Sequence, residues 1–307
     1  MCGIAALQLR NPELRSSMGS LLTTMLCEIV DRGPDSAGLA VYDNPALTAE
    51  GRSTLSLLGG DLGIRADDVD ALLGELAAEG LAAEGFGTEI KVVGDTTFIS
   101  AEVPAQDLAE AVARAYPQVV VAGRGERVAV MKSVGHPVEV TERHGLKAMH
   151  GTQAVSHTRM ATESAVTAGG SHPFSVADDL CLVHNGSFSN HASVRRELKR
   201  LGVHFDSEND TEVGARYVAH RLEQGDDLET ALVNLGKVLD GFYTLVVTTA
   251  DSMAVVRDPI ACKPAIIAQT EDWVAMASEF RALAELPGIE NARIFEPEPG
   301  KVYTWSL

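Results

Sequence analysis

Cysteine is scarce in this chain of 307 residues, which has four, at positions 2, 27, 181 and 262. No CxxC pair occurs, and the spacings fit neither a zinc site nor an iron–sulfur cluster, so we expect no metal site here. A disulfide framework is not expected in a large acidic chain. Cys27, Cys181 and Cys262 have the apolar neighbours typical of core residues. Only Cys2 stands where its chemistry could matter.

Basic residues and long apolar runs are also lacking. Lys and Arg number 25 against 43 Asp and Glu, which gives a net charge of −18. Such a surface repels phosphate backbones, so nucleic acid is not an expected partner. No uninterrupted apolar run reaches the roughly 18 residues of a membrane span, and MCGIAALQLRNP lacks the basic leader of a signal peptide. We therefore expect a cytoplasmic protein.

The composition is that of a globular protein, with 45% hydrophobic and 22% charged residues. Strands are predicted at Ile4–Leu9 and Ala37–Tyr42, on either side of a helix over Ser17–Val30. From residue 148 strand patterns return, with helices predicted at Asn190–Leu201, Thr211–Gln224 and Leu228–Leu239. Strands in blocks and helices in blocks favour an α+β fold with antiparallel sheets over a doubly wound parallel sheet. Residues from about 45 to 147 carry α/β patterning but no catalytic cluster, so we expect an accessory α/β insert there.

Cys2 is the first of four polar clusters. If Met1 is removed, one residue carries both a thiol, with a pKa of about 8.5, and an α-amine, with a pKa of about 7.7–8.0. The amine could then take the proton of the thiol, and no separate histidine would be needed. The alternative is an incidental cysteine at a frayed terminus.

The second cluster is HTRMAT at 157–162, at the end of a predicted strand. Arg159 offers a planar fork suited to a carboxylate, and Thr158 and Thr162 add hydroxyls. The alternative is a surface arginine in a salt bridge.

The third and fourth clusters are HNG at 184–186 and NDTE at 209–212. The side chain of Asn185 and the N–H of Gly186 could converge on one oxygen, as in an oxyanion hole, although Asn-Gly is also a favoured hairpin turn. Asp210 could hold a ligand ammonium or cap the helix that follows. Together the four clusters supply a nucleophile with its base, a carboxylate clamp, an oxyanion hole and an ammonium partner. An amino acid with a side-chain amide would satisfy all of them.

The ordered motif series resembles the class II glutamine amidotransferases, which use an N-terminal nucleophile. It comprises CGI at 2–4, RGPDSAG at 32–38, HTRMAT at 157–162, SHPF at 171–174, HNG at 184–186, NDTE at 209–212, GFYTLVV at 241–247, RDPIACKP at 257–264 and ASEFRAL at 277–283. The resemblance covers roughly 1–42 and 148–307. It implies a four-layer αββα sandwich, the N-terminal nucleophile hydrolase fold, for 1–307 with the α/β insert at about 45–147.

The resemblance also implies the catalytic roles. Cys2, freed of Met1, would attack the glutamine amide and form a γ-glutamyl thioester, while its α-amine shuttles the proton. Asn185 and the backbone of Gly186 would stabilise the oxyanion. The products would be glutamate and ammonia.

The implied binding roles fall on residues of four motifs. Arg159, helped by Thr162, would bind the α-carboxylate, and Asp210 would bind the α-ammonium. His172 matches a histidine that lines the pocket in sugar-amidating members. The remaining two implied residues belong to a supporting loop near the nucleophile: Arg32 and Asp35.

Three departures from the family pattern bear on function. Met160 replaces the aromatic residue of HTRWAT or HTRYAT, and the insert is additional. We also expect no domain that would use the ammonia after residue 307. The layout is similar to split glutamate-synthase-like systems, in particular to the amidotransferase-like subunit of N-methylglutamate synthase, which makes N-methylglutamate and ammonia from methylamine and glutamate. That similarity implies a flavin subunit with FMN, with or without an iron–sulfur cluster, and a β-helix-type subunit as partners, and glutamine or glutamate as the ligand.

Two other readings stay open. The chain could be a scaffold that binds glutamate or glutamine without hydrolysis. It could also be a structural subunit that retains Met1, in which case Cys2 would lack a free amine and be a poor nucleophile.

Overall fold

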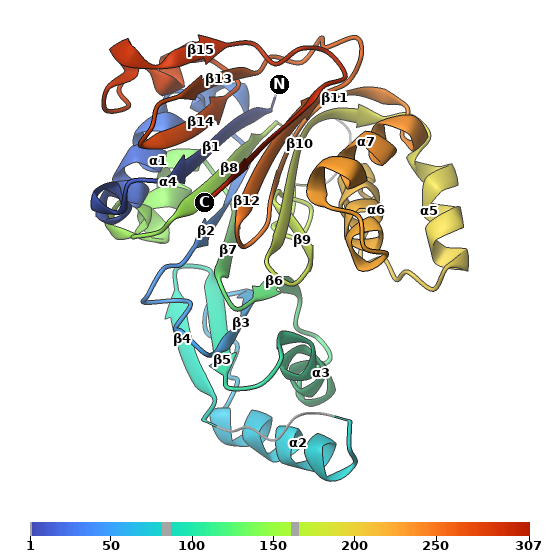
Figure 1. Ribbon diagram of the computed structural model, residues 1–307. Helices are drawn as coiled ribbons and strands as arrows, with labels where there is room; N and C mark the ends of the chain where they lie inside the picture. The colour runs from blue at the N-terminus through green and yellow to red at the C-terminus, as the bar shows by residue number, and fades with distance from the viewer. Residues whose placement is uncertain (1, 82–86, 161–165) are drawn as a thin grey trace.

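A computed structural model describes residues 2–81, 87–160 and 166–307. Its largest unit is a seven-stranded antiparallel sheet with the order β15-β13-β14-β1-β8-β2-β7 (Figure 1). The strands are β1 (Gly3–Leu9), β2 (Ser36–Tyr42), β7 (Val128–Val134), β8 (Gln153–Arg159), β13 (Ile266–Gln269), β14 (Trp273–Ala277) and β15 (Arg293–Phe295). β1 lies at its centre, between β14 and β8.

A second antiparallel sheet of five strands packs against the first, with the order β16-β12-β11-β10-β9. Its strands are β9 (Phe174–Ala177), β10 (Leu180–Phe188), β11 (Gly241–Thr248), β12 (Ser252–Arg257) and β16 (Val302–Ser306). Apolar side chains from the two inner faces form one continuous core, with Ile4 and Ala6 from β1 opposite Val183 of β10.

Helices cover both outer faces (Figure 1). The seven-stranded sheet carries α1 (Met18–Cys27) and α4 (Pro137–Arg143), and the five-stranded sheet carries α5 (His191–Arg200), α6 (Asp210–Glu223) and α7 (Leu228–Val238). Because side chains alternate along a strand, Ala5 and Leu7 face α1 while Ile4 and Ala6 face the other sheet. The layers run helices, sheet, sheet, helices, and the expected α+β sandwich is confirmed.

Short 3-10 helices complete the sandwich, at Pro12–Ser17, Val30–Arg32, Leu146–Ala148, Phe280–Leu283 and Ile289–Asn291. Within the described residues, no helix is both long enough and apolar enough to cross a membrane.

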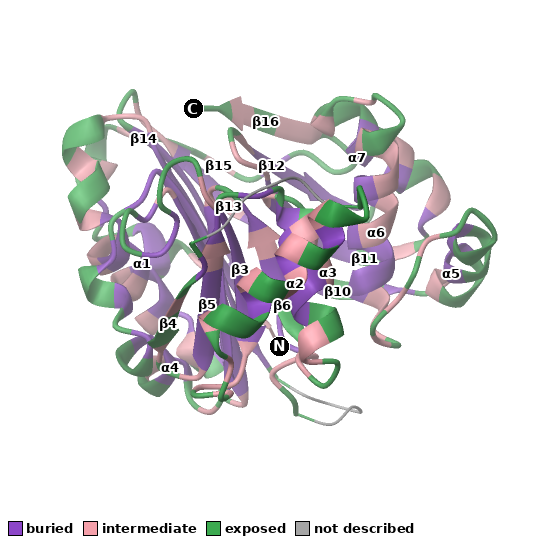
Figure 2. Cartoon of the chain, turned by 90° about the horizontal axis from the view of Figure 1, so that it is seen from below, coloured by how far each residue is buried: buried purple, intermediate pink, exposed green. Residues whose placement is uncertain are grey.

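The insert is a smaller unit with its own sheet, in the order β4-β5-β3-β6. It contains β3 (Ser53–Leu58), α2 (Ala66–Ala78), β4 (Glu89–Val93), β5 (Thr96–Ala101), α3 (Ala105–Ala115) and β6 (Val121–Gly125). Leu55, Leu73 and Leu108 belong to a core separate from those of the sandwich. Both insert helices bury one side and expose the other (Figure 2).

The limits of the insert differ from the expected range of about 45–147. β7 pairs with β2 along its whole length in the seven-stranded sheet, and α4 packs against α1. Residues from 128 onwards are therefore part of the sandwich. The pattern of RVAVMKSVG identifies a strand, but its pairing with β2, about ninety residues earlier, is not visible in local sequence.

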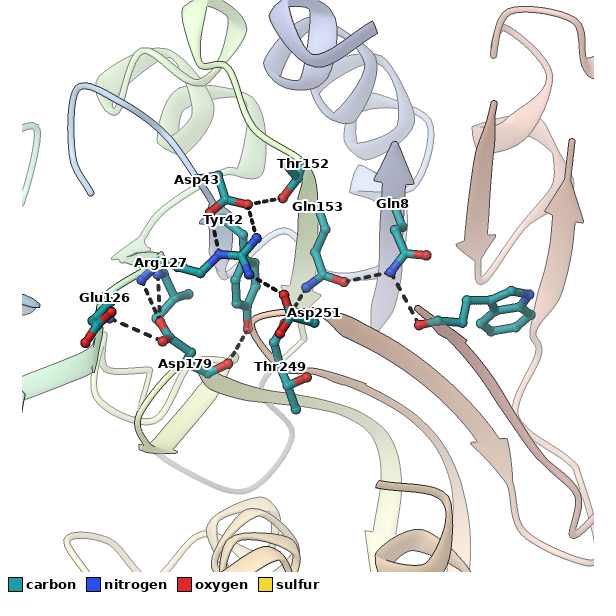
Figure 3. Close-up of polar contacts among 12 residues, drawn as sticks. Gln8, Tyr42, Asp43, Glu126, Arg127, Thr152, Gln153, Asp179, Thr249 and Asp251 are labelled. Carbon is teal, nitrogen blue, oxygen red and sulfur yellow. Dashed lines mark hydrogen bonds and ion pairs between the residues drawn. The ribbon is translucent and has the colours of Figure 1, made fainter. Parts of the chain in front are cut away.

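A polar cluster connects the segment between β6 and β7, where the chain leaves the insert, to both sheets of the sandwich (Figure 3). Arg127 forms salt bridges with Asp43, at the end of β2, and with Asp251, in the turn between β11 and β12. The carboxylate of Asp179 accepts hydrogen bonds from the backbone N–H groups of Arg127 (2.8 Å), Val128 (3.0 Å) and Glu126 (3.2 Å). The cluster lies at the opposite end of the strands from Cys2.

Candidate active site

Cys2 immediately precedes β1 and is held through its own carbonyl. That oxygen accepts hydrogen bonds from Nε of Arg32 (2.9 Å) and from Nδ2 of Asn185 (3.2 Å). The N–H of Ile4 donates to Oγ of Ser278 at 2.9 Å, which fixes the start of the strand. The Cys2 thiol is free and half-buried. The arrangement places this thiol where the two sheets meet, since Asn185 comes from the five-stranded sheet.

Arg32 reaches Cys2 from the loop after α1. Its side chain is buried and also forms a salt bridge with Glu279 at 2.9 Å. The hydrogen bond from Arg32 is the main reason that the pKa of Glu279 is lowered. Asp35 lies further along the same loop, where its backbone N–H donates to the Arg159 carbonyl (3.1 Å) and its carbonyl accepts from Gly135 (3.0 Å). The expected supporting loop thus joins Cys2 to the end of β8.

Asn185 and Gly186 lie within β10 rather than in a turn. They pair with Thr244 and Tyr243 of β11 in continuous register, so the hairpin-turn reading of Asn-Gly is wrong. Gly186 has a φ of +148°, and a Cβ added there would lie 2.0 Å from the Phe242 carbonyl oxygen. Only glycine fits, because a side chain would force the two strands apart.

Arg159 ends β8 and is 8% exposed, so it is not a surface arginine as the alternative reading required. Its backbone packs against Gly33, where an added Cβ would lie 2.5 Å from the carbonyl carbon of Arg159. Its guanidinium lies beside Gly170, where a Cβ would be 3.2 Å from Nη1. Thr162, the expected helper of Arg159, lies outside the described residues.

Asp210 opens α6 but does not cap it. The N-cap is Asn209, whose Oδ1 accepts from the N–H of Thr211 at 2.9 Å, so the capping reading of Asp210 is wrong. Oδ2 of Asp210 instead accepts from the N–H of Phe188, at the end of β10, at 2.9 Å. This contact ties the start of α6 to the strand that carries Asn185. The Asp210 side chain is 21% exposed, and its carboxylate has lone pairs left for an ammonium group.

A buried network of three histidines lies behind these residues, and sequence reasoning missed two of them. Nε2 of His157 contacts the His184 carbonyl (3.1 Å), and Nδ1 of His172 contacts Nδ1 of His157 (3.2 Å). Nε2 of His172 and Nδ1 of His184 both contact the Thr211 hydroxyl, at 2.8 and 3.0 Å. These three histidines and Thr211 belong to the motifs HTRMAT, SHPF, HNG and NDTE. Membership of these motifs is the sequence feature that could have identified them.

The contacts define one direction of hydrogen bonding through the network. His157 must donate from Nε2 to a carbonyl, so its Nδ1 accepts from His172. Nε2 of His172 is then bare and accepts from the Thr211 hydroxyl at 2.8 Å, a shorter contact than the 3.4 Å from that hydroxyl to Oδ1 of Asp210. The hydroxyl oxygen accepts in turn from Nδ1 of His184. Nε2 of His184 is the bare end, buried without a hydrogen-bond partner among the described residues.

Burial keeps the three imidazoles neutral. It lowers the pKa of His157 to about 3 and that of His184 to about 4, and it holds the pKa of His172 well below its usual range. His172 was expected to line the substrate pocket. It is 6% exposed and both of its ring nitrogens are engaged, so in this structure it links β8 to α6. In the described part of the chain, no group of three or more His, Cys, Asp or Glu side chains is arranged to hold a metal ion.

The sequence and fold of this chain are similar to those of known proteins. A family model described as a glutamine amidotransferase domain matches residues 157–285. The glutamine amidotransferase-like protein GlxB of Rhizobium meliloti is 44% identical over 99% of this chain and 98% of its own length. A putative glutamine amidotransferase of Methanothermobacter thermautotrophicus is 29% identical over the full length of both chains.

More distant relatives are larger. A Pseudomonas aeruginosa glutamine–fructose-6-phosphate aminotransferase is 42% identical over 33% of this chain and 16% of its own. The solved glutamine phosphoribosylpyrophosphate amidotransferase of Bacillus subtilis superposes with a TM-score of 0.61 at 19% identity, over 99% of this chain, and this chain spans 47% of it. That superposition supports the fold. Given the end-to-end similarity to the GlxB protein and the family match over the motif region, the chain belongs to the class II glutamine amidotransferase family.

Proposed function

We propose that this chain hydrolyses glutamine to glutamate and ammonia through a γ-glutamyl thioester on Cys2. The observation that carries the proposal is the hydrogen bond from Asn185 Nδ2 to the Cys2 carbonyl at 3.2 Å. It brings the expected oxyanion-hole donor to the expected nucleophile from a different sheet. An amide nitrogen has two hydrogens, so the second remains for an oxyanion.

The chemistry can be written for these residues. After removal of Met1, the α-amine of Cys2 takes the thiol proton, and the thiolate attacks the side-chain carbonyl carbon of glutamine. Asn185 and the N–H of Gly186 stabilise the oxyanion. The protonated α-amine then gives its proton to the leaving nitrogen, and ammonia departs. Water attacks the thioester, which releases glutamate and restores the thiol.

The same geometry supports a defined orientation for the substrate. The buried Arg159 guanidinium would pair with the α-carboxylate, and Thr162 would help it. Asp210 would pair with the α-ammonium from the start of α6. Because the Phe188 N–H and the start of α6 hold Asp210 in place, it would serve as a preformed partner.

At a finer level we propose that the chain is the amidotransferase subunit of a glutamate-synthase-like complex of the N-methylglutamate synthase kind. The support is the layout of the chain, in which an α/β insert interrupts the motif series. In this proposal a partner subunit carries FMN, with or without an iron–sulfur cluster, a β-helix-type subunit completes a cytoplasmic complex, and ammonia or an exchanged amine passes to the partner.

A pair of cysteine variants tests the proposed reaction. Cys2→Ala should abolish glutamate release from glutamine without changing the melting temperature. Cys181→Ala is the matched control, because Cys181 is fully buried between the sheets and burial raises the pKa of its thiol to about 11. That variant should keep activity and lose about 1 kcal/mol of stability. Equal loss of activity in both variants, or full activity in Cys2→Ala, would contradict the proposal and favour a non-hydrolytic binding role.

A further inference from the structure

A cavity of about 320 Å³ lies at the junction of the insert and the sandwich, apart from the Cys2 site. Strand β6 of the insert runs beside β7 and β9, the edge strands of the two sheets (Figure 1). The volume falls in the range of small-molecule sites. Six of the fourteen lining residues have apolar side chains: Leu58, Val120, Val121, Ala122, Phe174 and Val176. The others are Lys132, three hydroxyl residues, two glycines and two acids.

Lys132 is the notable member of this lining. It lies on β7, is 4% exposed, and places its ammonium 4.9 Å from the centre of the Phe174 ring. In the part of the chain that the structure describes, no group accepts a hydrogen bond from it. An ammonium has three donors, and a side chain with so little access to water gains from an acceptor placed beside them. Burial lowers the pKa of Lys132 to about 8, so the amine still carries a proton at neutral pH for most of the time.

The two acids in the lining already have partners. Glu212 accepts hydrogen bonds from the N–H groups of Asp206 and Ser207, both at 2.8 Å, and from the Ser207 hydroxyl at 2.7 Å. Arg216 forms salt bridges with both Glu212 and Asp206. Glu212 and the buried Cys181 thiol act on the pKa of Lys132 only through longer-range electrostatic interactions, without a hydrogen bond or salt bridge to its ammonium. Lys132 is therefore the charge in this lining that lacks a contacting counter-charge.

The geometry points to a binding site for a small organic acid, whose carboxylate pairs with Lys132 and whose apolar tail lies along Val120, Val121 and Phe174. A carboxylate supplies two acceptor oxygens for the ammonium donors. The hydroxyls of Thr167, Ser175 and Ser207 complete the polar side of the lining. Oγ of Ser175 is itself buried without a hydrogen-bond partner among the described residues.

This cavity is separate from the proposed glutamine site. None of Cys2, Arg159, Asn185, Gly186 and Asp210 lines it. The nearest link is Gly170, which lines the cavity and also lies beside the Arg159 guanidinium. A test must therefore distinguish an acid bound at Lys132 from an acid bound at Arg159.

Calorimetric titration with hexanoate and with hexanamide tests the inference on the intact chain. Hexanoate should bind saturably and at least tenfold more tightly than hexanamide, and Lys132→Met should remove that difference. Lys147→Met is the matched control, because Lys147 is exposed, and it should bind hexanoate like the unmodified sequence. Absence of saturable binding, equal affinity for acid and amide, or unchanged binding in Lys132→Met would overturn the site.

Two further measurements keep the test independent of the folding of Lys132→Met. In protein whose lysines carry ¹³C-methyl groups, hexanoate should shift the Lys132 resonance and leave that of Lys147 unmoved. Protein blocked at Cys2 with a glutamine-mimicking diazoketone should still bind hexanoate. Loss of binding on blocking would show that the acid occupies the glutamine site, and the inference would be wrong.

Discussion

At the scale of single residues, Cys2, the proposed nucleophile, is positioned through its carbonyl oxygen, and its thiol forms no disulfide. Arg32 and Asn185 both donate to the Cys2 carbonyl, from different parts of the chain. Two donors on one oxygen fix the orientation of the Cys2 carbonyl group, and with it the backbone that carries the thiol. Rigid placement of the reacting group is what a catalytic role would require.

Asn185→Ala should lower kcat for glutamine hydrolysis by about 10²–10³, with a smaller change in KM, because an oxyanion donor acts mainly in the transition state. Steady-state kinetics of glutamate release measure this. Asn190→Ala is the control, since the Asn190 amide bonds the backbone of residues 238 and 240 and no site residue. A loss in Asn185→Ala no larger than in the control would argue against an oxyanion hole here.

The buried histidines predict a dependence of stability on pH. From pH 6.5 down to about 4, the unfolded chain protonates these imidazoles and the folded chain does not, so the free energy of unfolding falls as the pH falls. Each histidine contributes a slope of up to about 1.4 kcal/mol per pH unit. Urea unfolding at pH 7.5, 6.5, 5.5 and 4.5 measures the slope.

A pair of histidine variants tests whether the buried histidines cause that slope. His157→Gln should reduce the slope by the contribution of about one proton, whatever its effect on stability at pH 7.5. His150→Gln changes an exposed histidine and should leave the slope as it was. The same slope in both variants would mean that acid destabilisation arises elsewhere.

Residue identities predicted much of the site but not its internal contacts. The motifs predict Cys2, Arg159, Asn185 and Asp210 as members of the candidate site, and the structure places Asn185 against Cys2. The alternatives drawn from local preferences, a helix cap at Asp210 and a hairpin turn at Asn-Gly, are wrong. Asn209 caps α6, and Asn-Gly lies inside a strand. Capping and turn preferences describe a few neighbouring residues, whereas the pairing of β10 with β11 is set by the sheet.

At the scale of elements, groups of polar residues lie at both ends of the central strands. One end of the central strands carries Cys2 and Arg159, and the other carries the cluster around Arg127 and Asp179 (Figure 3). The second cluster closes the bend between β6 and β7 against the turn between β9 and β10. It therefore holds the two sheets and the insert together at the end away from Cys2.

Asp179→Ala should lower the free energy of unfolding by about 2–4 kcal/mol, because it leaves three backbone N–H groups without their acceptor. Chemical unfolding at pH 7.5 measures this. Asp178→Ala is the matched control, since the neighbouring carboxylate is about half exposed and forms a surface ion pair with Arg124. The control should cost less than about 1 kcal/mol. Equal effects would show that the backbone contacts of Asp179 contribute little.

Most elements were predictable from periodicity and end signals. The helix expected at Thr211–Gln224 is Asp210–Glu223, and that expected at Leu228–Leu239 is Leu228–Val238. The pairing of strands was not predictable, because a strand pattern carries no information about its distant partner. Assigning β7 to the insert illustrates this, since only its pairing with β2 places it in the sandwich.

At the scale of the whole molecule, the insert is a unit with a core of its own beside the sandwich. Leu108→Ala, in α3, should cost the insert about 2–5 kcal/mol and leave glutamine hydrolysis intact. Hydrogen exchange should then rise in peptides from 53–125 and stay unchanged in peptides from β1 and β10.

Leu182→Ala provides the contrasting variant, because Leu182 is buried in β10 between the sheet and its helices. It should raise exchange in the sandwich and reduce hydrolysis. Uniform exchange throughout the chain in Leu108→Ala would contradict two separable units.

The most direct test of the account is the mass of the N-terminal peptide after treatment with a glutamine-mimicking diazoketone. Met1 should be absent and one adduct should be found on Cys2, with Cys27, Cys181 and Cys262 unmodified. This result would show a free N-terminal thiol in a glutamine-shaped site. Met1 still attached and Cys2 unlabelled would contradict the nucleophile, and the chain would then be a binding or structural subunit.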